Sequence, residues 1–204
     1  KQGVPDATHN VIFKTVSGFD PAVIDVGENV TVDVGTIQWS GNAKVVLTNG
    51  TIRLAGGNVI GNMPEDCGIK SDLELLADGV WYNDDSWGQR VRVYGAVSGV
   101  GSITVRGNQN RNVAFFDSAV SVPQVQVSAM SVIANAGTRF RGTKILVKGG
   151  FTSGTNGTSF SIPNKAGVDE SHYGVFREGS SIEFAGAGGG VSYTYAPVSV
   201  EEKL

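Results

Sequence analysis

The sequence contains a single cysteine, Cys67, in 204 residues. No disulfide can form within the chain, so the small disulfide-stapled secreted scaffold is excluded, as is a zinc site built from several thiolates. A lone cysteine most often behaves as a small buried hydrophobic residue, and we expect this of Cys67.

Long apolar segments are absent as well. No run of 18 apolar residues occurs, so we expect no membrane insertion. No signal peptide is visible, and the sequence starts at Lys1 without a methionine. We therefore expect a processed product or an excised fragment, from which a leader could have been removed.

Charge is low and proline is scarce, whereas glycine is abundant. The formal net charge is −3 and the basic residues are scattered along the sequence, which argues against a nucleic-acid partner. Only six residues are proline, but 29 are glycine, roughly twice the usual share. Valine and isoleucine are plentiful and charged residues make up 17%, so the composition is not that of a disordered chain. The glycines lie between strand-like runs, which indicates a turn-rich β protein.

The stretch from Val91 to Gly149 carries the clearest structural signal. Apolar and polar residues alternate in short runs bounded by Gly, Asn, Ser or Pro, which is typical of half-buried strands joined by turns. No segment of comparable length has a helical stripe, so the sequence predicts an all-β fold. The predicted strands centre on Val91–Val93, Ile103–Val105, Val113–Phe115, Val125–Val127 and Ile145–Val147.

A short unit recurs along the chain: a glycine, then Thr or Ser, then alternating apolar positions. The spacing between copies is irregular, so it is not a strict array. It is compatible with a solenoid whose coils have loops of variable length, and also with a sandwich that has glycine turns. The units begin at Gly35, Gly50, Gly101, Gly142, Gly157 and Gly179.

The predicted organisation is one β-rich domain, residues 21–196, with an extended N-terminal arm, 1–20, and a C-terminal tail, 197–204. Residues 23–34 are predicted to form a hairpin or two successive solenoid edges. Ser71 to Asp78 allows a short helix or a strand at Leu73–Leu75. The strand is favoured because its neighbours are strands.

Two turn sequences, Ser98-Gly-Val-Gly-Ser102 and Asn135-Ala-Gly-Thr138, lie within residues 95–147. This region resembles the strand repeats of autotransporter passenger domains, and phage tail fibres and polysaccharide-handling β-helices are similar. The resemblance implies a right-handed parallel β-helix exposed at a cell or particle surface. A β-sandwich or jelly roll is the alternative.

One aromatic and acidic cluster stands out as a candidate site for a ligand or partner: Trp81, Tyr82, Asp84, Asp85 and Trp87. Glycoside cleavage needs two carboxylates that face each other across a sugar, whereas adjacent aspartates on a strand point to opposite faces. Trp and Tyr offer flat, amphipathic area for sugar rings or a protein surface. The alternative is core packing beside a solvated turn.

Other candidates for chemistry are weak. The only histidines are His9 and His172, and Asp169-Glu170-Ser171-His172 contains the residue types of a hydrolase triad in the wrong geometry. The glycine run at 186–190 lacks the Lys-Ser/Thr and the helix that a phosphate-binding loop needs. We therefore predict no catalytic residue, no metal and no cofactor.

The favoured function is that of a non-enzymatic structural or adhesive β protein, extracellular, on a cell surface or on a virion. It would associate with copies of itself as a capsid, fibre or filament subunit, because exposed strand edges invite pairing. One alternative is a carbohydrate-binding module that uses the aromatic cluster on surface glycans. A β-helix polysaccharide lyase or hydrolase is the other.

Overall fold

The computed structural model describes residues 4–15, 21–41, 43–83, 90–107, 113–128, 131–134, 138–148, 159–161, 175–176 and 179–185. Within these ranges the chain is all β, with no helix, as the alternation predicts. The described residues accordingly include no helix long and apolar enough to cross a membrane.

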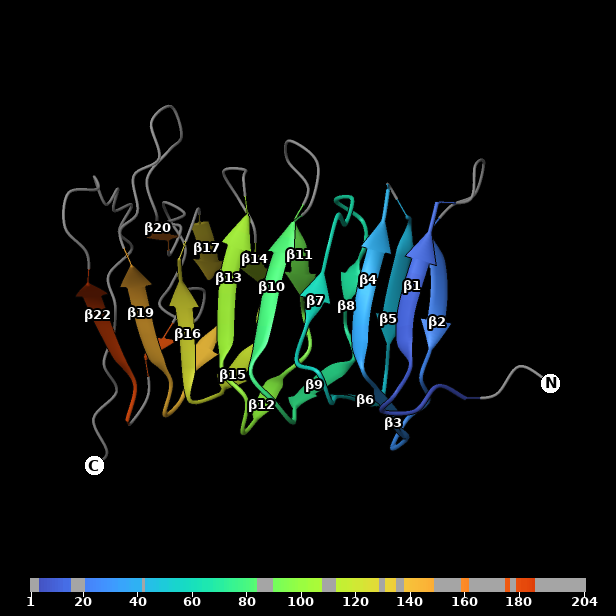
Figure 1. Ribbon diagram of the computed structural model, residues 1–204, viewed down its shortest axis with the longest axis horizontal. Helices are drawn as coiled ribbons and strands as arrows, with labels where there is room; N and C mark the ends of the chain where they lie inside the picture. The colour runs from blue at the N-terminus through green and yellow to red at the C-terminus, as the bar shows by residue number, and fades with distance from the viewer. Residues whose placement is uncertain are drawn as a thin grey trace.

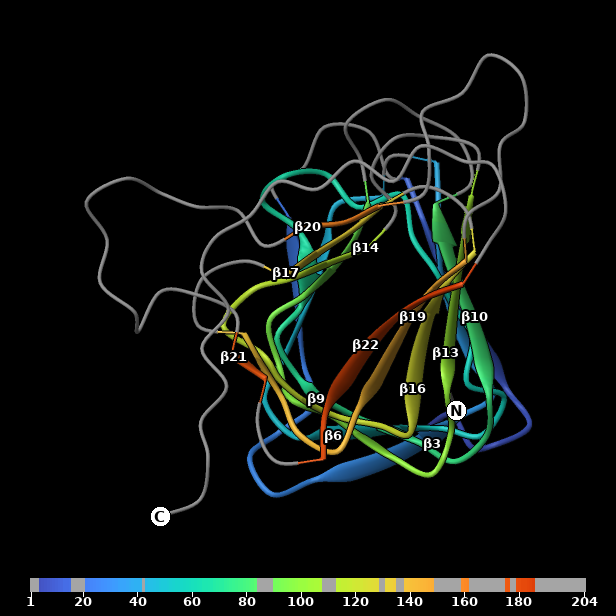
Figure 2. The same cartoon turned by 90° about the vertical axis from the view of Figure 1, so that its left-hand side faces the viewer.

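The strands form three sheets, and the chain visits them in the repeating order A, B, C (Figures 1 and 2). Sheet A contains β1 (Asn10–Lys14), β4 (Thr36–Ser40), β7 (Val59–Ile60), β10 (Gly79–Asn83), β13 (Ile103–Gly107), β16 (Gln124–Val127), β19 (Lys144–Lys148) and β22 (Ser181–Ala185). Sheet B contains β2 (Ala22–Asp25), β5 (Val45–Thr48), β8 (Gly68–Ile69), β11 (Val91–Val93), β14 (Val113–Phe115), β17 (Ser131–Ala134) and β20 (Ser159–Ser161). Sheet C contains β3 (Thr31–Val34), β6 (Thr51–Leu54), β9 (Asp72–Leu75), β12 (Val97–Gly99), β15 (Ala119–Ser121), β18 (Arg139–Phe140) and β21 (Val175–Phe176).

Each strand from β1 to β19 pairs in parallel with the strand three places further along the chain, so three consecutive strands make one coil of a parallel β-solenoid. Seen along its axis, the solenoid is roughly triangular (Figure 2). The sandwich and jelly-roll alternative is ruled out, because those folds are built from antiparallel pairs. The antiparallel contact recorded in the described chain is an isolated bridge between Met63 and Arg90.

Several sequence predictions can be placed directly. The five strands predicted after residue 90 are β11, β13, β14, β16 and β19, and the strand favoured at Leu73–Leu75 lies in β9. The hairpin option for residues 23–34 is wrong. Their two strands, β2 and β3, belong to sheets B and C, so they are the successive solenoid edges of the other option. Strand β1 lies in the predicted arm and pairs with β4, whereas the tail 197–204 lies outside the described residues.

The core is a stack of apolar columns that run along the solenoid. On sheet A the column in register contains Ile37, Val59, Trp81, Val105 and Val127, each 2% exposed or less. Alternation at period two puts these residues inside and their neighbours outside. Burial of one such side chain contributes about 1.5–3 kcal/mol, so the columns supply the main driving force for coil stacking.

Polar side chains continue the hydrogen-bond ladder around the corners. The Asn58 side-chain oxygen accepts a 2.7 Å bond from the amide of Val80, one coil later. Asp78 does the same for the amide of Ser102, also at 2.7 Å. These bonds satisfy backbone donors where the strands end, so the stack stays in register through the turns.

Glycines mark the corner between sheets C and A because the coils approach each other too closely for a side chain. A Cβ at Gly79 would lie 1.8 Å from the carbonyl oxygen of Gly57, and one at Gly101 would lie 2.0 Å from that of Ala77. Any larger residue would have to push the two coils apart. Close backbone approach, rather than turn chemistry alone, explains part of the glycine content.

Candidate functional site

Trp81, the first residue of the predicted site, belongs to the core. It is 0% exposed, and its indole Nε1 donates a 2.9 Å hydrogen bond to the carbonyl oxygen of Gly57. Its ring centroid lies 6.2 Å from that of Phe115, which sheet B contributes. Alternation along β10 turns Trp81 inward, so this ring cannot form part of a surface platform.

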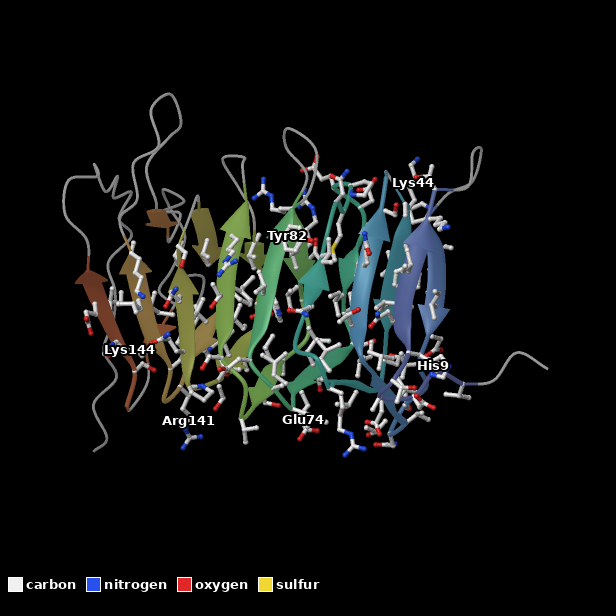
Figure 3. All side chains as sticks on the ribbon, viewed as in Figure 1. His9, Lys44, Glu74, Tyr82, Arg141 and Lys144 are labelled. Atoms are coloured by element: carbon white, nitrogen blue, oxygen red, sulfur yellow. The ribbon has the colours of Figure 1, made fainter. Side chains whose placement is uncertain are left out.

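Tyr82 points the other way, onto the outer face of sheet A (Figure 3). It is half-buried and lies in register with Ile60 of β7 and with the exposed Arg106 of β13. The other predicted members, Asp84, Asp85 and Trp87, lie outside the described residues. An aromatic ring beside a guanidinium is chemistry that suits a hydroxylated or acidic ligand.

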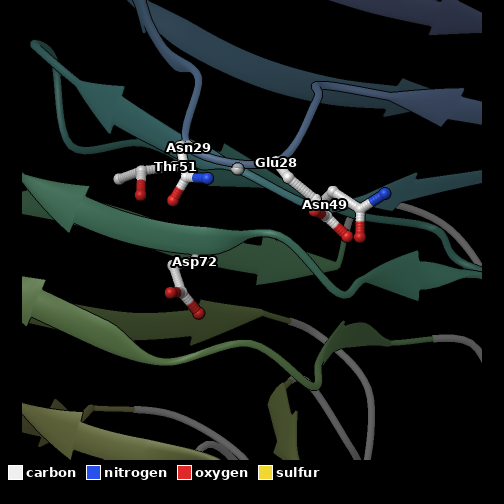
Figure 4. A pocket seen from close by; sticks show the side chains of 6 residues that line it. Glu28, Asn29, Asn49, Thr51 and Asp72 are labelled. Atoms are coloured by element: carbon white, nitrogen blue, oxygen red, sulfur yellow. The ribbon is translucent and has the colours of Figure 1, made fainter.

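A shallow depression of about 320 Å³ lies where the chain turns from sheet B to sheet C in the early coils (Figure 4). Two of its polar side chains already make hydrogen bonds within the fold. Asp72 Oδ1 accepts the amide of Ala96 at 2.8 Å, and the side-chain nitrogen of Asn49 donates to Asp25 at 2.9 Å. The lining residues are Glu28, Asn29, Asn49, Gly50, Thr51 and Asp72. We assign no ligand to this depression.

The N-terminal segment holds an exposed turn in which Asp6 is tightly bonded. The Thr8 hydroxyl and amide donate to its Oδ1 at 2.7 and 2.9 Å, and His9 Nδ1 lies 2.7 Å away. These contacts, first the Thr8 hydroxyl, then the Thr8 amide and then His9, lower the pKa of Asp6 to about 2. The Thr8 hydroxyl bonds the Asp6 carboxylate and not the His9 ring, so the turn lacks the nucleophile–base contact of a triad. The triad-like residues 169–172 and the glycine run 186–190 lie outside the described residues.

Cys67 is buried, as the sequence predicts, and burial raises the pKa of its thiol. A thiol that keeps its proton at neutral pH is a poor nucleophile. Within the described ranges no group of three or more His, Cys, Asp or Glu side chains is arranged to hold a metal ion.

Among the described residues, the apolar columns end at β1, β2 and β3, with no further described strand stacked on them. Ile24 of β2 is 40% exposed, whereas its register partner Leu47 in the next coil is 3% exposed. Val11 and Phe13 of β1 are likewise only partly buried. Five of the seven exposed large apolar residues of the described chain lie within residues 4–30: Val4, Ile12, Val23, Ile24 and Val30.

The backbone of the same three strands is open. β1, β2 and β3 each stand at the end of their sheet, so one edge of each pairs with no described strand. A bare strand edge beside exposed apolar side chains is a template for pairing with another chain. We call the first coil, β1 to β3, the open end. The sequence carried no local signal for it, because burial there depends on what lies next in the stack.

Coil stacking converts position in the sequence into position along the solenoid. Residues 1–89 contain 12 Asp or Glu against 5 Lys or Arg, a net charge of −7. Residues 90–148 contain one acidic residue, Asp117, against eight basic residues, a net charge of +7. The charged residues that the structure describes are therefore segregated along the axis, although the basic residues appear scattered in the sequence. The sequence gives these numbers of acidic and basic residues, but only the stacking of the coils turns them into a separation of charge along the solenoid.

No protein-family model, no curated protein and no solved structure matches this chain.

Proposed function

We propose that the chain is a non-enzymatic structural or adhesive β protein that works by associating with copies of itself. The observation that carries the proposal is the open end, where partly exposed apolar side chains and three strand edges have no described strand stacked on them. Another coil stacked there would continue both the columns and the hydrogen-bond ladders. An extracellular or virion setting is what the resemblance to passenger domains and phage fibres implies.

The geometry of such stacking decides what is assembled. If the open end of one copy meets the far end of another, the contact is heterologous and repeats into a filament. If two open ends meet, the contact closes a dimer. Either arrangement would bury Ile24, Val11 and Phe13, and each Å² of apolar area buried is worth roughly 25 cal/mol.

The described titratable groups support a non-enzymatic role. The three with shifted pKa values are Asp6 in the N-terminal turn, Arg53 on sheet C and Cys67 before β8. The pKa of Arg53 is raised because its guanidinium bonds the Asp33 carboxylate. The three groups lie on different elements, whereas catalytic groups with perturbed pKa values gather in one cleft.

The test is electron microscopy and light scattering of the full chain, with Ile24→Lys at the open end as the variant. We expect assemblies for the parent chain and their loss in the variant, because the introduced ammonium would be buried at the contact. Thr104→Lys is the control. Thr104 is half-buried on the outer face of sheet A, and this variant should assemble normally. A parent chain that stays monomeric under every condition would overturn the proposal.

The pairing of Tyr82 with Arg106 favours glycan recognition as a second candidate function. The residues involved would be Tyr82, Arg106 and the predicted residues Asp84, Asp85 and Trp87. Glycan-array binding that is lost in Tyr82→Ala and in Trp87→Ala, with unchanged thermal unfolding, would support it. Binding that survives both substitutions would remove it.

A further inference from the structure

The outer face of sheet C combines charge with small side chains. Arg53 of β6 bonds Asp33 of β3 at 2.6 and 2.8 Å, and Glu74 of β9 is the next residue in the same register. After Glu74, this register line continues with Ser98 of β12 and Ser121 of β15, both exposed. The face therefore carries charged side chains in its early coils and small serine side chains in its middle coils.

Beyond the flat centre the sign of the charge changes. Arg139 opens β18 and lies 3.6 Å from Asp117, and the exposed Arg141 follows the same strand. The amide of Arg141 bonds the carbonyl of Val120, which places Arg141 beside Ser121 in the register line that contains Glu74. β9 and β18 are three coils apart, so opposite charges flank two neutral strands.

Exposed apolar side chains lie at one edge of this face. Leu76 and Val100, which are 40% and 76% exposed, are the first residues after β9 and β12. They are the two exposed large apolar residues of the described chain that lie outside residues 4–30. An apolar and small-residue centre with a charged rim is the usual anatomy of a protein interface.

We propose that sheet C packs against sheet C of a second copy, with the two solenoid axes antiparallel and a two-fold axis between β12 and β15. This inference rests on the proposed function, since it specifies one self-association contact. The two-fold runs parallel to the strands, so it brings β9 opposite β18 of the second copy and β12 opposite β15. Glu74 then faces Arg141 of the second copy, and the same pair forms again on the other side.

The charge distribution selects this arrangement over a parallel one. In a parallel, in-register pair, Glu74 would face Glu74 and Arg141 would face Arg141, and such like-charge contacts disfavour association. The antiparallel pair brings the acidic coils of residues 1–89 opposite the basic coils of residues 90–148. Packed sheets lie about 10 Å apart, a distance that the long Glu74 and Arg141 side chains span on either side of Ser98 and Ser121.

The expected affinity is modest. Six strands at about 4.8 Å spacing, each two to four residues long, give a face of roughly 300 Å² per copy. That lies below the roughly 600 Å² per partner of weak specific interfaces, so we expect a dissociation constant of about 100 μM or weaker that rises with salt.

The first test is charge reversal and rescue, measured by sedimentation equilibrium. Arg141→Glu should weaken dimerisation at least tenfold, because both symmetry-related contacts become repulsive, and Glu74→Arg should do the same. The double variant Glu74→Arg/Arg141→Glu restores opposite charges and should return to within about threefold of the parent. Lys148→Glu, at an exposed basic residue on sheet A, is the matched control and should leave dimerisation unchanged.

The second test does not depend on Glu74, whose replacement also affects Arg53. Chains carrying Ser98→Cys and chains carrying Ser121→Cys are mixed and treated with a short bis-maleimide. The proposed two-fold places position 98 of one copy opposite position 121 of the other, so mixed cross-links should dominate. Predominant 98–98 cross-links would overturn the inference, since they require a parallel pair or a two-fold through β12. The native Cys67 is buried and serves as the unreactive background.

The failure of this inference is distinguishable from failure of the proposed function. Association that is unchanged in Arg141→Glu, or that is weakened equally by Lys148→Glu, overturns the sheet C contact and leaves self-association standing. A chain that is monomeric in every variant and in the parent overturns both.

Discussion

The indole Nε1 of Trp81 donates a hydrogen bond to the carbonyl oxygen of Gly57, one coil earlier, at 2.9 Å. The bond joins two neighbouring coils inside the core, next to the corner where Gly79 lies directly over Gly57. A residue that resembles a surface platform in the sequence is thus a structural link between coils.

Replacing Trp81 by phenylalanine should therefore reduce stability. The change removes the donor, leaves the Gly57 carbonyl without it and creates a cavity, at a cost of about 2–4 kcal/mol. Chemical denaturation of both variants measures the difference. Tyr82→Phe, one residue away on the outer face, should cost less than about 0.5 kcal/mol. Equal losses in the two variants would contradict the inward placement of Trp81.

Two glycine-to-alanine substitutions distinguish two reasons why a position requires glycine: the close approach of another coil, and a left-handed backbone conformation. Gly79→Ala puts a methyl group within 1.8 Å of the Gly57 oxygen and should cost at least about 3 kcal/mol, because the coils must move apart. At Gly142, with φ of +61°, a Cβ would meet nothing within 4 Å, so only the left-handed backbone is penalised, by about 1–2 kcal/mol. Thermal unfolding should rank the two in that order, and the reverse order would contradict the coil spacing.

Much of the strand pattern was predictable from the sequence. The alternation after Val91 located five strands because period two is a local property of the chain. The glycine and hydroxyl unit preceded real strands at Gly35, Gly50 and Gly101, which lead into β4, β6 and β13. These predictions needed no knowledge of which strands pair.

The candidate site was less predictable, because it depends on long-range neighbours. Alternation requires Trp81 and Tyr82 to face opposite ways but does not say which faces inward. The turn at Gly27 to Asn29, with positive φ at both residues, looked like a hairpin although it joins two different sheets. The open end and the separation of charge along the axis appear only when the coils are stacked.

Asp6 should titrate far below an ordinary aspartate. Its pKa of about 2 is below the unfolded value of about 3.9, so the Thr8 and His9 contacts stabilise the native turn above that value. This contribution is lost as the pH falls from about 4 through about 2. A carbon-detected NMR titration measures the pKa, which Thr8→Ala should raise because it removes the hydroxyl donor. An unchanged pKa in that variant would show that Thr8 is not the main cause.

The most direct test of self-association is sedimentation velocity of the full parent chain across a wide range of protein concentration. We predict that faster-sedimenting species appear and grow as concentration rises, as mass action requires for copies that associate. A single slow boundary with the mass of one 21.3 kDa chain at every concentration would contradict the account.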